Sequence, residues 1–215
     1  MTNPFVVAFD LDGTLVNTTP SITKSLNQAL HSNGFDQVTL DFVKELVGLP
    51  VESLFGHLNV DLIQLRNLVF TFREQLRNNL SSPEDVFPGI LEALNYLSGL
   101  GVQLIVSTSK PTELSILTLK NVDLFTFFDH VVGTDNGSHK PDPWVLNESA
   151  KIARRKIDLY IGDRLEDAEA AQRASIPFVG ILHSIHTKND FNAFPNAAIL
   201  ENSTHLLEFL TDFSI

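Results

Sequence analysis

The stretch that most constrains this chain lies near its amino terminus, where an apolar run ends in Asp10-Leu11-Asp12-Gly13-Thr14. The β-branched and aromatic residues before it predict a buried strand, and Gly13 lets the backbone turn sharply there. In a strand, Asp10 and Asp12 share one face and lie roughly 7 Å apart. Two carboxylates so placed repel each other unless a cation or a proton intervenes. The stretch therefore predicts a metal or phosphate site at a strand end.

Composition limits the class of protein. The 215 residues are 43% hydrophobic and include 16 Phe, enough for a substantial core in one domain with an insertion or in two domains. Acidic residues outnumber basic ones by 26 to 15, which argues against nucleic acid or an anionic membrane as partner but not against a small anionic substrate. The absence of cysteine excludes disulfides, thiolate zinc sites and cysteine catalysis. With no leader pattern and no apolar run near the ~20 residues of a membrane span, we expect a soluble cytoplasmic protein.

Helical periodicity dominates residues 17–82, which contain no convincing strand. Apolar stripes predict helices at about 19–33, 39–48, 54–58 and 61–78, followed by a linker at 81–85. Past the linker, apolar strands alternate with helices, and the predicted strands lie at 102–108, 128–133, 159–163 and 178–182. Together with the first strand they predict an α/β protein with a parallel sheet covered on both faces. We predict a core domain of residues 1–16 and 83–215 and an inserted all-helical domain of residues 17–82.

Polar residues follow four of the five predicted strands. In an open α/β sheet, ligands bind beyond the carboxyl ends of the strands, so we expect these side chains to gather there. They are Asp10, Asp12, Gly13 and Thr14 after the first strand, Ser107, Thr108, Ser109 and Lys110 after the second, Lys140 after the third, and Asp163, Glu166 and Asp167 after the fourth.

Three acids, a hydroxyl and an ammonium at one sheet edge have a coherent chemical use. Carboxylate oxygens with water suit Mg²⁺, which commonly bridges protein carboxylates to a substrate phosphate. Asp10 is then ionised and able to attack phosphorus, while Asp12 protonates the leaving oxygen and later activates water. Thr108 and Lys140 can hold the phosphoryl oxygens, because phosphoryl transfer depends mainly on positioning and charge stabilisation.

Four segments of the chain resemble, in order, the four motifs of the haloacid dehalogenase superfamily. They are Phe9–Leu15, a hydroxyl after the second strand, Lys140-Pro141, and Gly162-Asp163 with Asp167 four residues later. The helical insertion is similar to the first cap class of that family, and residues 47–50 and 108–111 resemble its phosphoglycolate phosphatase branch. The resemblance implies a Rossmann-like core under an inserted helical cap. It also implies Mg²⁺-dependent hydrolysis of a small phosphate ester through an aspartyl phosphate.

The same resemblance assigns roles to individual residues. Asp10 becomes the nucleophile and Asp12 the general acid and base, and Mg²⁺ is held by Asp10, the backbone carbonyl of Asp12, and Asp163. The substrate phosphate contacts are Gly13, Thr14, Thr108, Ser109 and Lys140, although Ser107 is the neighbour of Thr108 and the register could differ by one. Asp167 is an outer-shell residue or simply an acid at a helix N-terminus.

Some residues and alternatives stay open at this level. Arg164 departs from the small hydroxyl residue common at that place in the family, and His183 and His186 follow the fifth strand without an assigned role. We expect a phosphoric monoester hydrolase that acts on a small phosphorylated metabolite, as a monomer or a homodimer. The alternatives are a sugar phosphomutase or a pyrophosphatase of the same superfamily, or a non-catalytic member that binds phosphate. The helical stripes do not identify the substrate.

Overall fold

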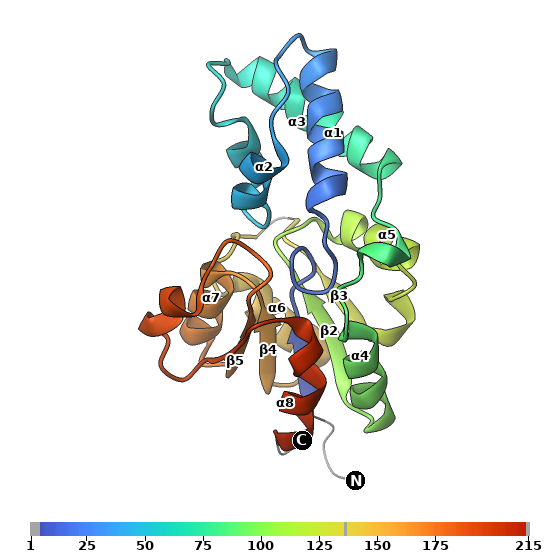
Figure 1. Cartoon of the computed structure of the whole chain (residues 1–215), viewed down its shortest axis with the longest axis vertical. Helices are drawn as coiled ribbons and strands as arrows, with labels where there is room; N and C mark the ends of the chain where they lie inside the picture. The colour runs from blue at the N-terminus through green and yellow to red at the C-terminus, as the bar shows by residue number, and fades with distance from the viewer. Residues whose placement is uncertain (1–4, 136, 214–215) are drawn as a thin grey trace.

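The computed structural model describes residues 5–135 and 137–213, which form a sheet with helices on both faces and a helical unit beyond one edge of that sheet (Figure 1). The strands are β1 (Val6–Phe9), β2 (Gln103–Ser107), β3 (His130–Val132), β4 (Leu159–Gly162), β5 (Phe178–Ile181) and β6 (Ala198–Leu200). The five predicted strands are confirmed. The sixth strand, β6, was not predicted.

All strand pairs in the sheet are parallel, and the spatial order is β3-β2-β1-β4-β5-β6. The chain builds outward from β1 to β3 on one side, then returns to β4 on the other side of β1. This reversal places a topological switch point between β1 and β4, where open α/β sheets bind their ligands. Phe9 pairs with Val106 of β2 and with Ile161 of β4, so Asp10 leaves the sheet between these two neighbours.

Both faces of the sheet are buried, as parallel strands require. Val7 and Phe9 of β1 belong to one hydrophobic cluster and Val6 and Ala8 to the other, which follows from the alternation of side chains along a strand. The first cluster packs under α4 (Ile90–Gly99), α8 (Leu206–Asp212) and the end of α5 (Thr112–Asn121), and the second under α6 (Trp144–Ala153) and α7 (Leu165–Ala174). The predicted doubly covered sheet is therefore confirmed.

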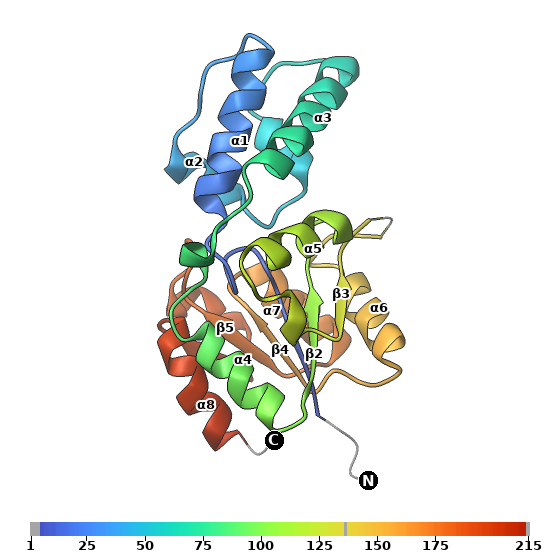
Figure 2. The same ribbon diagram turned by 90° about the vertical axis from the view of Figure 1, so that its right-hand side faces the viewer.

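The helical unit consists of α1 (Thr19–Ser32), α2 (Leu40–Leu46), the short 3-10 helix η1 (Val51–Phe55) and α3 (Leu62–Asn78). Figure 2 shows it beyond the carboxyl ends of the strands. It has its own hydrophobic cluster, which includes Leu26, Phe55 and Phe72 and extends to Leu114 of α5. The helical character of residues 17–82 agrees with the sequence, except that the helix expected at 54–58 is a 3-10 helix shifted toward residue 51. The division at residues 16/17 and 82/83 stays a prediction.

Two neighbouring segments connect the helical unit to the sheet. Val16 and Val86 form an antiparallel bridge, the Asn17 amide donates to the Asp85 carbonyl at 2.8 Å, and the Phe87 amide donates to the Leu15 carbonyl at 3.1 Å. The linker expected at 81–85 contains a 3-10 turn, η2 (Pro83–Asp85). Among the residues that the structure describes, no helix has the length and apolar character needed to cross a membrane.

Candidate active site

Asp10 and Asp12 leave the end of β1 and are almost fully buried, with 2% and 6% of their surfaces exposed. The turn after them depends on Gly13, whose φ of +86° is in the left-handed region. A Cβ at this position would lie 2.5 Å from Oδ2 of Asp163, so only glycine allows the two strand ends to come so close. The Thr14 hydroxyl donates to Oδ1 of Asp163 at 2.7 Å. The loop after β1 is therefore built onto the end of β4.

Lys140 joins Asp10 to Asp167. Its Nζ lies 2.9 Å from Oδ1 of Asp10 and 2.5 Å from Oδ1 of Asp167, and it donates to the Tyr160 hydroxyl at 2.9 Å. Burial disfavours the Lys140 ammonium, but the two carboxylates outweigh this effect and raise the pKa of Lys140. Lys140 is thus a permanently charged group held beside Asp10.

The carboxylates of Asp10, Asp163 and Asp167 form a compact acidic cluster in which one oxygen from each lies within 4.8 Å of the others. Burial raises the pKa of Asp10 from 3.8 to about 6, with Lys140 acting in the opposite direction. Burial and then the charges of Asp167 and Asp10 also raise the pKa of Asp163. Carboxylates that are buried and mutually repelling in this way favour a cation among them. The cluster therefore fits a divalent metal ion with a preference for oxygen ligands.

The three carboxylates of this cluster differ in how many oxygens remain without a hydrogen-bond or ion-pair partner and so could bind a metal. Asp167 uses Oδ1 for Lys140 and Tyr160, and its Oδ2 accepts from the backbone amides of Asp163 and Arg164 at 3.2 and 3.0 Å. It is therefore already saturated with donors, a pattern that agrees with an orienting rather than a directly ligating residue. Asp163, which accepts a hydrogen bond from Thr14, retains the second oxygen for a ligand.

Asp12 forms a second buried ion pair, with Lys110. Lys110 Nζ donates to Asp12 Oδ1 at 2.9 Å, and the side chains are 6% and 9% exposed, respectively. The sequence places Lys110 after the second strand but gives it no role. The pair could have been suspected only from the position of a lysine at the same sheet edge as an unpartnered acid.

The three hydroxyl residues at the end of β2 and in the loop after it have different environments. The Ser107 hydroxyl lies 2.7 Å from the Ser149 hydroxyl of α6 and is fully buried, so it does not face the site. Thr108 Oγ1 accepts from the Lys110 amide at 3.3 Å. Ser109 Oγ is buried without a hydrogen-bond partner and lines the cavity described next, which makes it the hydroxyl most available to a ligand.

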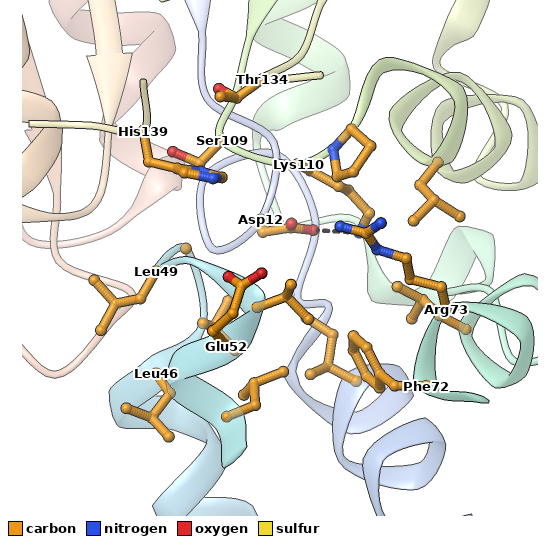
Figure 3. Close-up of a pocket in the computed structure, with 18 of the residues that line it drawn as sticks. Asp12, Leu46, Leu49, Glu52, Phe72, Arg73, Ser109, Lys110, Thr134 and His139 are labelled. Carbon is orange, nitrogen blue, oxygen red and sulfur yellow. Dashed lines mark hydrogen bonds and ion pairs between the residues drawn. The ribbon is translucent and has the colours of Figure 1, made fainter. Parts of the chain in front are cut away.

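A cavity of ≈ 290 Å³ lies between the strand ends and the helical unit. Figure 3 shows Asp12, Ser109 and His139 on the sheet side, while Glu52 of η1 and Arg73 of α3 point toward Asp12 from two other sides. Apolar side chains of the helical unit complete the wall and are represented in Figure 3 by Leu46, Leu49 and Phe72. The cavity is small, contains charges of both signs and opens onto Asp12.

The three residues without an assigned role lie around the site in different environments. His183 stacks on Phe87 and places Nδ1 3.2 Å from the Gly13 carbonyl, while its Nε2 accepts from the Ser203 amide. Burial lowers the pKa of His183 to about 4, so this imidazole is a neutral support for the Gly13 turn. Burial also lowers the pKa of His186, which lies edge-on to Phe191. Arg164 is directed toward the helical unit.

Comparison with known proteins adds the following similarities. The family model described as haloacid dehalogenase-like hydrolase matches residues 7–181. A phosphoglycolate phosphatase from Rhodobacter capsulatus is 31% identical over 207 residues, covering 88% of this chain and 89% of that protein. A haloacid dehalogenase-like hydrolase from Bacteroides fragilis has a similar structure, with a TM-score of 0.84, 26% identity, and coverage of 95% and 100% of the two chains. A β-phosphoglucomutase from Clostridium difficile shares the fold, with a TM-score of 0.79, 17% identity, and coverage of 98% and 96%.

Proposed function

The chain belongs to the haloacid dehalogenase-like hydrolase family and is a phosphatase, and we propose that it hydrolyses a small phosphate monoester of the phosphoglycolate type through an aspartyl phosphate. The observation that carries this proposal is the juxtaposition of Asp10 and Asp12. The Asp10 carboxylate lies 2.9 Å from the Lys140 ammonium, and the Asp12 carboxylate lies 2.9 Å from the Lys110 ammonium and lines the cavity with it. This arrangement supports two different roles for two acids of the same type.

The first half-reaction transfers the phosphoryl group to the protein. Asp10 attacks phosphorus, a bond forms between its carboxylate oxygen and phosphorus, and the bond between phosphorus and the ester oxygen breaks. Asp12 gives its proton to the departing oxygen, which leaves as an alcohol. In the second half-reaction Asp12 takes a proton from water and the water oxygen bonds to phosphorus. The bond between the Asp10 oxygen and phosphorus breaks, which releases inorganic phosphate and restores the Asp10 carboxylate.

Mg²⁺ is the proposed cofactor, held by Asp10, the backbone carbonyl of Asp12 and Asp163, with Asp167 as the orienting outer-shell acid. When bound, it would neutralise the acidic cluster and the phosphate charge. The buried cluster of Asp10, Asp163 and Asp167 and the raised pKa values of Asp10 and Asp163 support this assignment.

The proposed phosphate contacts combine charge with donors from several loops. Lys140 supplies the ammonium beside Asp10, Ser109 supplies a hydroxyl without a protein partner, and Thr108 lies in the same loop. Gly13 and Thr14 form the turn after β1. Because the Thr14 hydroxyl already donates to Asp163, Thr14 would contact the phosphate through its backbone. The helical unit acts as the cap that covers these groups.

The cavity supports a substrate of a few carbon atoms. Arg73 has no ion-pair partner within the described part of the chain and extends toward Asp12, so it can meet a second anionic group on the substrate, such as a carboxylate. The name of the Rhodobacter capsulatus relative agrees with such a substrate. The β-phosphoglucomutase neighbour keeps a sugar phosphomutase as the second candidate, because the same fold serves both reactions.

The test is a panel of phosphate monoesters that includes phosphoglycolate, glycerol phosphates and hexose 1-phosphates, together with pyrophosphate, in the presence of Mg²⁺. We expect the wild-type protein to release inorganic phosphate, with the largest kcat/KM for a small ester that carries a carboxylate. Asp10→Asn serves as the control for contaminating phosphatase. Conversion of a hexose 1-phosphate into the 6-phosphate without release of phosphate would instead favour the second candidate function, a sugar phosphomutase. Phosphate release from none of the compounds would contradict the proposal.

A further inference from the structure

We infer that Arg164 is a positioning residue that holds the helical unit closed over the cavity, a role that rests on the proposed function for its kinetic consequence. Arg164 lies between Asp163 and the first turn of α7, on the sheet side of the molecule. Its side chain nevertheless contacts the helical unit, and only 5% of the residue is exposed. The inference starts from the partners of this guanidinium.

Each side-chain nitrogen of Arg164 has its own partner. Nη1 donates to the Val47 carbonyl at 2.9 Å, Nη2 donates to the Glu45 carbonyl at 3.3 Å, and Nε donates to the Glu166 carboxylate at 3.0 Å. Two bonds therefore cross from the sheet to the helical unit, and the third fixes the guanidinium to α7. A planar fork of donors suits this geometry, whereas a lysine ammonium cannot reach all three acceptors in the same directions.

The two carbonyls that receive the guanidinium lie at the end of α2. The last carbonyls of a helix have no amide four residues further on, so they require an outside donor. Carbonyls at a helix end also carry partial negative charge, which favours a cation. Arg164 therefore supplies what the end of α2 lacks, and the helical unit loses this donor if it moves away from the sheet.

The backbone of the helical unit is shaped to receive this side chain. Gly48 has a φ of +88°, and a Cβ at this position would lie 2.9 Å from Cδ of Arg164. Gly34, also in the helical unit, has a φ of +78° but no atom within 4 Å of such a Cβ. The close approach at Gly48 is thus specific to the Arg164 contact and is not a general feature of the turns in this unit.

The Arg164 contact joins the two halves of the proposed active site. On one side its backbone amide donates to Asp167, which also receives Lys140. On the other side Val47 and Gly48 line the cavity. Loss of the side-chain bonds would release the cavity wall without removing any group that touches the phosphate. We therefore expect substrate binding to suffer more than the chemical step.

The position of the helical unit can be measured without any enzyme assay. The chain has no cysteine, so spin labels can be attached at Asn67→Cys in α3 and Gln172→Cys in α7, two exposed positions on opposite sides of the contact. In the otherwise wild-type protein we expect one narrow distribution of label distances. Arg164→Met should broaden this distribution or add a longer distance. Arg164→Lys is the milder change, and its distribution should be intermediate between those of the wild-type protein and Arg164→Met. An unchanged distribution in both variants would overturn the inference.

A matched pair of glycine variants tests the same contact from the other side. Gly48→Ala should displace Arg164 and shift the label distances as Arg164→Met does, whereas Gly34→Ala should leave them as in the wild-type protein. Both replacements carry the strain of a positive φ, so they differ only in the contact with Arg164. Equal distance distributions for Gly48→Ala and Gly34→Ala would contradict the inference.

The kinetic result separates the inference from the proposed function. On the best ester of the panel, Arg164→Met should raise KM about tenfold with a smaller change in kcat, as expected for lost hydrogen bonds to a charged group, and Arg164→Lys should recover part of the loss. A fall in kcat at constant KM would contradict the positioning role. If the wild-type protein releases no phosphate from any ester, the proposed function fails, while the label distances still decide whether Arg164 holds the helical unit.

Discussion

Lys110 Nζ lies 2.9 Å from Oδ1 of Asp12, and both side chains are buried at the floor of the cavity. This buried ammonium fixes the direction of one of the two carboxylate oxygens of Asp12, the proposed general acid and base. The other oxygen is left for the substrate or for water. Lys110 is therefore expected to support the proton transfers of Asp12 and not to bind phosphate alone.

Replacing Lys110 by methionine tests this role. Lys110→Met keeps most of the side-chain volume but leaves Asp12 buried without its partner, so we expect kcat to fall by about a hundredfold, the scale of general acid-base catalysis. Lys151→Met, which removes an exposed lysine paired with Glu148, is the matched control and should leave kcat unchanged. An unaltered kcat in Lys110→Met would refute the role.

Asp10→Asn removes the proposed nucleophile with little change in shape. Turnover should fall by at least about a thousandfold, because an amide cannot form the phosphoryl intermediate. The variant should remain folded, since the replaced carboxyl is a buried charge whose ionisation opposes folding. Steady-state kinetics and circular dichroism check the two expectations. Turnover at a rate near that of the wild-type protein would show that another group attacks phosphorus.

The raised pKa of Asp10 predicts how the stability of the metal-free protein depends on pH. The folded-state pKa, about 6, lies above the usual 3.8, so the folded state holds this proton more tightly than the unfolded chain. The stabilisation is complete below pH 3.8 and is lost as the pH rises through 6, and the shift corresponds to about 3 kcal/mol. Urea unfolding between pH 3 and 7 should show that wild type loses stability relative to Asp10→Asn by this amount. A constant difference between the two proteins over this range would contradict the prediction.

Chelation tests the acidic cluster directly. EDTA should stop phosphate release, and Mg²⁺ should restore it, because the acidic cluster needs a cation to offset the repulsion among its carboxylates and the charge of the phosphate. Mg²⁺ should also raise the melting temperature more at pH 7.5 than at pH 5, where protons compete for the same carboxylates. Asp163→Asn should weaken both effects. Full activity in the presence of the chelator would exclude a metal-dependent mechanism.

The gathering of Asp10, Asp12, Lys140 and Asp163 could be predicted because parallel strands deliver their carboxyl ends to one edge. Once the strands are recognised in the sequence, the residues that follow them are expected at that edge. The same argument predicted that the sheet is covered on both faces. The sixth strand could not be predicted, since three residues, Ala198–Leu200, are too short to show a pattern.

The partners of these residues were harder to predict, because they depend on the direction of single side chains. Tyr160 lies in a strand, and its aromatic ring is typical of a core residue. Nothing in its spacing indicates that its hydroxyl forms hydrogen bonds with Lys140 and Asp167. Lys110 follows a run of hydroxyl residues, and only the course of the loop turns its ammonium toward Asp12. The partners of the Arg164 side chain depend on the position of the helical unit relative to the sheet, and no local sequence pattern determines that position.

The paired connections beside Val16 and Val86 have a consequence for the evolution of such a molecule. The entry and exit of the helical unit are hydrogen-bonded neighbours, so the sheet would close with a short turn if the residues between them were deleted. The same acids would then lie at an open edge, without the cavity wall that the helical unit supplies. The two connections thus allow the wall of the cavity to be exchanged while the strand ends that carry the acids stay unchanged.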